Sequence, residues 1–172
     1  MPVPETTCCF TGHRAAKLPW GFQESDPRCV ALKQQIYDAV EAVYASGVRH
    51  FICGMANGCD LYFGEAVLRL QRGHPDITLE AAVPYEGQAQ RWSPEQKARW
   101  DYLCDACDYQ TVVSHSYTPD CMMRRNRYMV DNSSVVIAAF NGSSGGTLNT
   151  ILYAMRKKRE VIQISIESEE HL

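Results

Sequence analysis

Short apolar runs alternate along the chain with longer stretches in which apolar residues recur at three- and four-residue intervals. The short runs are typical of buried β-strands, and the longer periodic stretches are typical of amphipathic helices. The pattern therefore predicts strands over 6–10, 50–53, 77–83, 111–113, 135–140 and 161–166. It predicts helices over 29–46, 60–72, 94–107, 118–132 and 147–158, with Ser93 as a cap and Gly47 as a stop.

Strands that alternate with helices imply crossover connections, and hence a mostly parallel sheet covered on both faces. The predicted fold is α/β, a Rossmann-like three-layer α/β/α sandwich with about six strands. A chain of 172 residues without an internal repeat or linker fits one domain over 1–172. Ligands of such sheets bind beyond the carboxyl ends of the strands, where the strand order reverses. The loops after the first, second, fourth and fifth strands are therefore the candidates.

Composition and charge narrow the partners. The net charge of −3 provides no global field that would attract nucleic acid or a membrane surface, so nucleic acid is an unlikely partner and any anion site is local. No apolar run approaches the ~20 residues of a membrane span, and residues 1–10 lack a signal-peptide pattern, so we expect a cytoplasmic protein. The eight cysteines are then expected to be reduced.

The Cys104–Cys107 pair has the CxxC spacing of a redox pair or of half a zinc site. No second CxxC or suitable histidine pair accompanies it, and the five histidines form no metal-binding pattern. We therefore expect no metal site, while the role of these two cysteines stays open.

Two of the candidate loops follow the first and second strands. In the first, Gly12 lets backbone N–H groups approach an anion, and Thr11, His13 and Arg14 offer donors around it, although an ordinary polar turn has the same composition. In the second, two glycines four residues apart precede a helix whose N-terminus would face a phosphate. Its acidic residue either caps that helix or accepts from a ribose hydroxyl. The candidates of this loop are Gly54, Met55, Gly58 and Asp60.

The helix before the fifth strand carries three arginines within four residues, Arg124, Arg125 and Arg127. Guanidinium groups bind phosphate or carboxylate in a bidentate manner, although a solvated charged face is the alternative. After the fifth strand, small residues lead into Gly145, Gly146 and Thr147, which suits a backbone anion cradle or a flexible surface loop. No lysine follows as in a Walker A loop, and the first loop departs from GxGxxG.

Four motifs together resemble the SLOG superfamily, in particular its YpsA-like branch: CCFTGHR (8–14), GMANGCD (54–60), RRNRYMVD (124–131) and GGTLNT (145–150). GMANGCD and the RNR stretch are also similar to motifs of the DprA family, and Arg125, Gly146 and Thr147 fall where the LOG phosphoribohydrolases have their arginine and GT. The resemblance implies a Rossmann-like sheet that binds a nucleotide, ADP-ribose or a similar derivative. Because many SLOG proteins pair, it also suggests a homodimer.

The departures from the LOG pattern bear on catalysis. The position of the LOG glutamate is Thr150 here, and the lysine after the arginine is Asn126. Without that carboxylate the resemblance favours ligand binding or sensing, with a LOG-like phosphoribohydrolase as the alternative. Arg125 and Asp131 are the catalytic candidates, and Glu65 and Glu86 are further carboxylates that could substitute. A DprA-like single-stranded DNA binder is the third reading, which the net charge opposes. No cofactor is required, and a bound nucleotide is the one small molecule expected.

Overall fold

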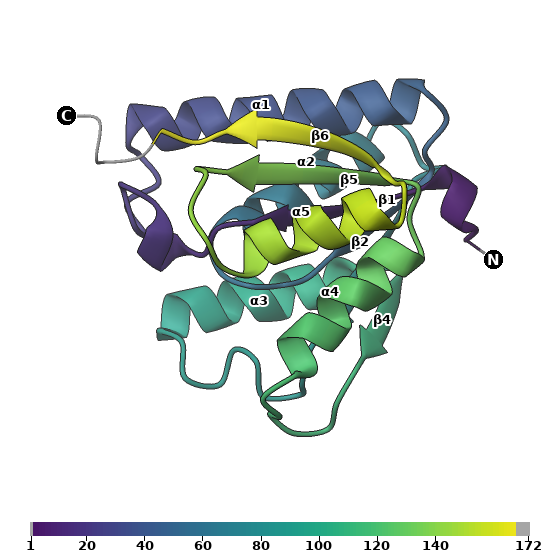
Figure 1. Cartoon of the computed structure of the whole chain (residues 1–172). Coiled ribbons are helices and arrows are strands. Elements are labelled where there is room, and N and C mark those ends of the chain that lie inside the picture. Colours follow the sequence, from purple (N-terminus) through teal and green to yellow (C-terminus); the bar gives the residue numbers. More distant parts are fainter. Residues whose placement is uncertain (1, 168–172) are drawn as a thin grey trace.

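One six-stranded sheet forms the centre of the protein (Figure 1), as seen in a computed structural model that describes residues 2–167. Every strand pair is parallel, and the order across the sheet is β4-β3-β2-β1-β5-β6. This confirms the predicted Rossmann-like α/β class. The strands are β1 (Thr7–Gly12), β2 (His50–Cys53), β3 (Thr78–Val83), β4 (Tyr109–Val112), β5 (Val135–Phe140) and β6 (Glu160–Ser165).

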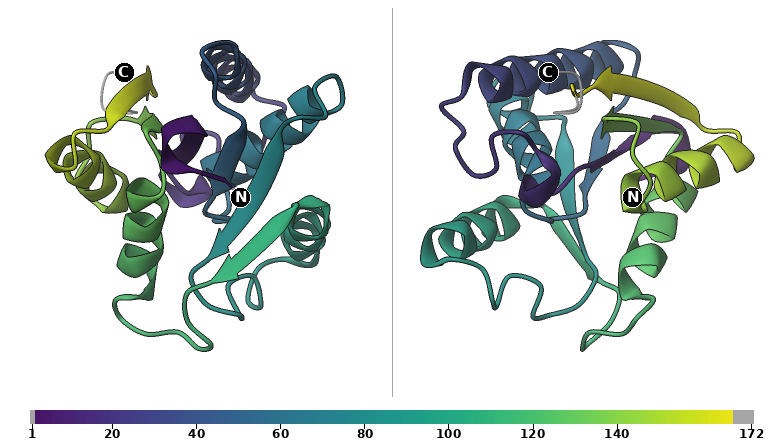
Figure 2. Two further views of the ribbon diagram at one scale, coloured as in Figure 1. Left: turned by 90° about the vertical axis from the view of Figure 1, so that its right-hand side faces the viewer. Right: turned by 60° about the vertical axis from the view of Figure 1, so that its left-hand side comes forward.

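Helices cover both faces of the sheet, as the left view of Figure 2 shows. Alternate residues of each strand point to opposite faces, so Cys8 and Phe10 join a large core under α1 and α2, while Cys9 joins a smaller core under α4 and α5. The α3 helix lies on the same side as α2. The helices are α1 (Pro27–Ala45), α2 (Cys59–Gln71), α3 (Pro94–Ala106), α4 (Cys121–Asp131) and α5 (Gly146–Arg156).

The strand order reverses between β1 and β5. The chain moves from β1 to β2 on one side, and it returns later to place β5 against the other side of β1, where Gly12 pairs with Ala139. The loops that follow these two strands turn toward opposite faces. This switch point leaves a crevice at the carboxyl end of the sheet, where the sequence places its ligand loops.

The observed helix ends lie within about three residues of the predicted ones, and the largest difference is at the start of α4. Ser93 caps α3 by accepting from the Gln96 N–H at 3.3 Å. The α4 helix begins at Cys121, two residues later than Pro119 predicts, because the Cys121 N–H bonds the Thr118 carbonyl in a turn. At α2 the capping residue is Gly58, and the Asp60 carboxylate accepts from the Ala56 N–H instead of capping the helix.

All eight cysteines are free thiols, and seven of them are buried. Burial raises the pKa of Cys104, and it raises that of Cys107 to about 12, which disfavours the thiolate form of both side chains. Within residues 2–167, no three His, Cys, Asp or Glu side chains gather as a metal site would require. None of the helices there is long and apolar enough to cross a membrane.

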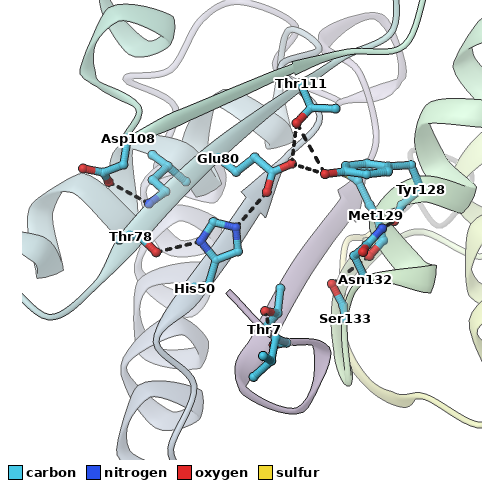
Figure 3. A network of polar contacts seen from close by, with 12 residues as sticks. Thr7, His50, Thr78, Glu80, Asp108, Thr111, Tyr128, Met129, Asn132 and Ser133 are labelled. Carbon is cyan, nitrogen blue, oxygen red and sulfur yellow. Dashed lines mark hydrogen bonds and ion pairs between the residues drawn. The ribbon is translucent and has the colours of Figure 1, made fainter. Parts of the chain in front are cut away.

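A buried polar network joins three strands to α4 at the end of the sheet away from the switch point (Figure 3). Glu80 accepts hydrogen bonds from His50 Nε2 at 2.8 Å, Thr111 Oγ1 at 2.9 Å and Tyr128 at 2.5 Å. Thr78 Oγ1 lies 2.7 Å from His50 Nδ1. Burial raises the pKa of the Glu80 carboxyl, but these hydrogen bonds outweigh burial and hold the pKa below its ordinary value. The network therefore anchors α4 to the sheet through a carboxylate.

We expect the substitution Glu80→Gln to lower the free energy of unfolding by about 1–3 kcal/mol at pH 7, because a charged acceptor of three hydrogen bonds is lost. A carboxylate with a lowered folded-state pKa contributes stability above the unfolded pKa, and this is lost as pH falls through the folded pKa. The difference between the two proteins should therefore shrink below about pH 4. Urea unfolding between pH 7 and pH 3 measures it. Glu160→Gln, at an exposed site, is the control, and a constant difference across pH would contradict the assignment.

Candidate functional site

A pocket of about 330 Å³ opens at the switch point, between the loop after β1, the start of α2, and helices α4 and α5. We call it the switch-point pocket. It brings together residues from all four motifs, which are far apart in the sequence. The predicted site residues that line it are Thr11, Gly12, His13, Arg14, Asp60, Arg125, Gly146 and Thr147.

The loop after β1 is held in place from both sides. The His13 carbonyl accepts from the Cys59 N–H at 3.1 Å, and the Ala15 N–H donates to Asn57 Oδ1 at 3.1 Å, so the loop is fixed to the start of α2. On the other side, His13 Nε2 accepts from the Asn141 N–H at 3.1 Å. This bond requires a neutral ring, and burial together with Lys17 lowers the pKa of His13. His13 therefore positions the loops as a neutral acceptor.

Arg125 and Asp60 form a buried charged cluster around Gly54. Arg125 Nη1 donates to the Gly54 carbonyl, and its Nε donates to Asn126 Oδ1 at 2.8 Å. A Cβ at Gly54 would lie 2.9 Å from both Arg125 Nη1 and Asp60 Oδ2, so glycine is what lets the two side chains converge. Burial lowers the pKa of Arg125, and the nearby Asp60 carboxylate partly offsets this shift. Burial raises the pKa of Asp60, and the nearby Arg125 guanidinium partly offsets that shift. Arg125 lines the pocket although only 4% of the residue is exposed to solvent.

The charge of the switch-point pocket is positive, although that of the chain is negative. Arg14, Lys17 and Arg125 line it, and Asp60 is the one carboxylate among its lining residues. Lys17 also donates from Nζ to the Ser144 carbonyl at 2.9 Å, which holds the loop before α5 over the pocket. Three cations thus face one acid in a small, partly enclosed space.

The N-terminus of α5 closes the pocket. Gly146 is its first residue and Thr147 its second, and both line the pocket. The preceding Gly145 has φ +138°, a conformation that favours glycine and turns the chain into the helix. The first N–H groups of a helix lack intrahelical acceptors and carry partial positive charge, which complements an anion.

Six predicted site residues do not line this pocket. Gly54 and Gly58 lie beneath it as packing positions, and Met55 is fully buried in the large core with φ +64°. Gly145 lies just before the lining residues. Arg124 is exposed and 3.5 Å from Asp120, and Arg127 stacks on Tyr153 at 5.3 Å. Helical periodicity explains the arginines: of the three, only Arg125 is on the side of α4 that faces the sheet.

The carboxylates proposed as catalytic substitutes also lie elsewhere. Asp131 ends α4 and accepts from the Tyr153 hydroxyl at 2.7 Å. Glu65 pairs with Arg99 at 2.6 Å, and Glu86 pairs with His115 at 3.0 Å. Thr150 is buried and donates to the Gly146 carbonyl at 2.8 Å. None of these residues lines the switch-point pocket.

Sequence reasoning missed several lining residues, namely Ala16, Lys17, Ala56, Met122, Asn126 and Met129. Lys17 ends a short 3-10 helix over Ala15–Lys17, Arg14 directly precedes that helix, and both side chains line the pocket. Asn126 is the residue between two named arginines, and its side chain orients Arg125. Met122, Asn126 and Gly146 also line a larger groove of about 900 Å³ between α4 and α5, which adjoins the pocket.

Comparison with known proteins places this geometry among related chains. The model of the YspA SLOG family matches residues 8–168. The SPbeta prophage-derived protein YoqJ of Bacillus subtilis is 28% identical over 144 residues, which cover 76% of this chain and 84% of that protein. A UPF0398 protein of Bacillus cereus (strain Q1) is 21% identical over 153 residues, covering 88% of this chain and 83% of that protein.

Two solved structures share the fold. DNA processing protein A (DprA) from Streptococcus pneumoniae superposes with a TM-score of 0.59 at 19% identity, covering 91% of this chain. This chain spans about half, 49%, of that protein. DprA from Helicobacter pylori, whose structure is described for its single-stranded DNA binding mode, superposes with a TM-score of 0.63 at 14% identity. This superposition covers 98% of this chain and 70% of the Helicobacter pylori chain.

Proposed function

The chain belongs to the YspA SLOG family, and we propose from this and from its switch-point pocket that it binds a phosphorylated, nucleotide-type ligand there. The observation that carries the proposal is the convergence of Arg14, Lys17 and buried Arg125 on the N-terminus of α5 in a chain of net charge −3. A local cluster of cations that the global charge does not explain suits a local anion.

Each part of the pocket has a role in this proposal. Arg125 already uses Nη1 and Nε, and among residues 2–167 no hydrogen bond engages Nη2. That nitrogen is therefore the donor for a ligand phosphate. Arg14, which is exposed, adds charge from the rim. The first N–H groups of α5 approach the same anion from the far side.

Saturable binding is the expected result when the protein meets ribose 5-phosphate, AMP or ADP-ribose. At ~100 times the dissociation constant, a ligand adds about 2.7 kcal/mol of stability, which raises the melting temperature by roughly 5–10 °C for a chain of this size. Arg14→Ala should weaken the binding by roughly tenfold or more, because a hydrogen bond to a charged group contributes about 1.5–3 kcal/mol. Differential scanning fluorimetry and titration calorimetry measure both effects.

Arg124→Ala is the matched control, since Arg124 is an exposed arginine that does not line the pocket. It should leave the affinity unchanged. Equal weakening by both substitutions would indicate a diffuse charge effect, and the absence of any stabilisation at millimolar ligand would overturn the proposal.

Single-stranded DNA is the second candidate ligand, favoured by the likeness to DprA from Helicobacter pylori. The net charge of −3 is a poor argument against it, because Arg127 and Arg156 line the groove that adjoins the pocket and extend its positive surface. Anisotropy of a labelled oligothymidylate at rising salt tests this candidate. Binding to n phosphates should give a slope of about −0.7n in log K against log salt.

Hydrolysis of a nucleotide is a weaker candidate, since the pocket offers one carboxylate. Asp60 accepts from the Ala56 N–H at 3.1 Å, and burial raises its pKa. A chromatographic search for free base after incubation with nucleoside monophosphates decides between binding and hydrolysis. We expect no release of base.

A further inference from the structure

A separate pocket, of about 570 Å³, lies at the ends of β3 and β4. We call it the aromatic pocket. Its walls are the segments 85–92 and 115–117, which follow neighbouring strands and meet at the bottom of Figure 1. Carboxyl ends of parallel strands share one edge of the sheet, so the aromatic pocket and the switch-point pocket open at the same end of the molecule. The residues that matter to its chemistry are Tyr85, Gln88, Arg91, Trp92, His115 and Tyr117.

Two tyrosine rings define the aromatic pocket. Tyr85 and Tyr117 meet edge to face, with centroids 5.5 Å apart and planes at 83°. Tyr117 is 62% exposed, so a ring held at a fixed angle by its neighbour still presents a face to solvent. Trp92 adds a third, partly buried ring. Exposed aromatic faces in a concave site are suited to stacking on a planar aromatic ligand.

One side chain connects the two pockets. Gln88 lines the aromatic pocket, and its Nε2 donates to the Gly54 carbonyl at 3.2 Å. The same carbonyl accepts from Arg125, which lines the switch-point pocket. Gln88 Oε1 in turn accepts from Trp100 Nε1 at 3.0 Å, so the glutamine is fixed at both ends. The Gly54 carbonyl therefore links one lining residue of each pocket through hydrogen bonds.

The polar groups of the aromatic pocket fit a nucleobase. Arg91 is exposed beside the rings, and His115 pairs with Glu86 at 3.0 Å, so donors and acceptors surround the aromatic faces. The volume lies within the roughly 300–1,000 Å³ of small-molecule sites. We propose that the aromatic pocket is a subsite that stacks a nucleobase of the ligand whose phosphate occupies the switch-point pocket. The inference rests on the proposed function.

Four probes separate the base from the phosphate: ribose 5-phosphate, AMP, a short oligothymidylate and an abasic strand of the same length. We expect the wild type to bind at least one base-bearing probe more tightly than its base-free counterpart. Tyr117→Ala should lower the affinity for that probe by about tenfold, which is the effect of losing one stacked base. The affinity for the base-free probe should stay unchanged. Tyr117→Phe, which keeps the ring, should bind as the wild type does. Titration calorimetry on the full chain measures each affinity.

Tyr102→Ala is the matched control, because Tyr102 is 69% exposed on α3 and does not line the aromatic pocket. An effect on AMP would place the base on the same nucleotide as the phosphate, and an effect on the oligothymidylate alone would place it on a neighbouring unit of a strand. Equal affinity for base-bearing and base-free probes would overturn the subsite while the proposed function stands. The subsite would also be overturned if the Tyr117→Ala protein bound every probe with wild-type affinity, or if its affinity for all four probes fell equally. Failure of the wild type to bind any of the four would overturn both.

Discussion

Replacing Gly58 with alanine is expected to lower the free energy of unfolding by about 4 kcal/mol. Gly58 has φ +84° and ψ −129°, a conformation that L-residues rarely adopt and that adds roughly 1–3 kcal/mol of strain. A Cβ there would also lie 2.6 Å from the Ala15 nitrogen and 2.9 Å from the His13 oxygen. Because both are backbone atoms, relief requires the loop to move, which adds about 1–3 kcal/mol more. Urea unfolding measures the sum.

The displaced loop carries His13 and Arg14, so the alanine protein should also lose affinity for phosphate ligands. Gly21→Ala is the matched control, since Gly21 has φ +57° but nothing within 4 Å of an added Cβ. It tests backbone strain alone, and we expect a loss of about 1 kcal/mol. If both substitutions gave the same small loss, the tight contact between Gly58 and the loop after β1 would be refuted.

Gly58 also illustrates what the sequence could and could not predict. The alternation of apolar runs and amphipathic stretches predicts the parallel sheet, because strand and helix periods are local properties of the chain. The same glycine is predicted as a ligand contact, since a glycine before a helix is typical of a phosphate cradle. In the structure it serves packing: its missing side chain admits the backbone of the loop after β1. A pattern of glycines does not reveal what approaches them.

The arginines of α4 show the same limit. Three arginines in four residues predict a positive surface, but only one of the three packs against the sheet. Arg125 is buried against Gly54, whereas Arg124 lies in solvent and Arg127 over Tyr153. That choice depends on the rotation of α4, which the Tyr128–Glu80 hydrogen bond fixes from a distant part of the chain. Lys17 was missed for a related reason, because its side chain reaches the pocket through a tertiary bond to Ser144.

Arg125→Met is expected to weaken phosphate-ligand binding by about 100-fold and to lower the free energy of unfolding by about 3 kcal/mol. The first effect follows from the loss of a buried, charged donor in the pocket, where such hydrogen bonds contribute about 1.5–3 kcal/mol each. The loss of stability follows from Asp60, which is only 5% exposed. Its carboxylate would keep the hydrogen bond from the Ala56 N–H but would lose the nearby positive charge of Arg125. Removing one partner of a buried charged pair typically destabilises by about 3–5 kcal/mol.

A double substitution separates these two effects. In Asp60→Asn/Arg125→Met the uncompensated carboxylate is gone, so much of the stability should return, whereas binding should stay lost because the donor is still absent. The wild type, the single variants Asp60→Asn and Arg125→Met, and the double variant form a double-mutant cycle. Urea unfolding of the four proteins gives the coupling energy, and titration calorimetry gives each affinity. Arg125→Lys keeps the charge but not the planar fork that reaches Gly54 and Asn126, so its affinity should lie between those of the wild type and the methionine protein. If the stabilised double variant bound phosphate ligands as tightly as the wild type, the anion site would have to lie outside the switch-point pocket. Loss of binding in a protein that has regained its stability would instead assign the anion to Arg125 itself, because altered folding could no longer account for it.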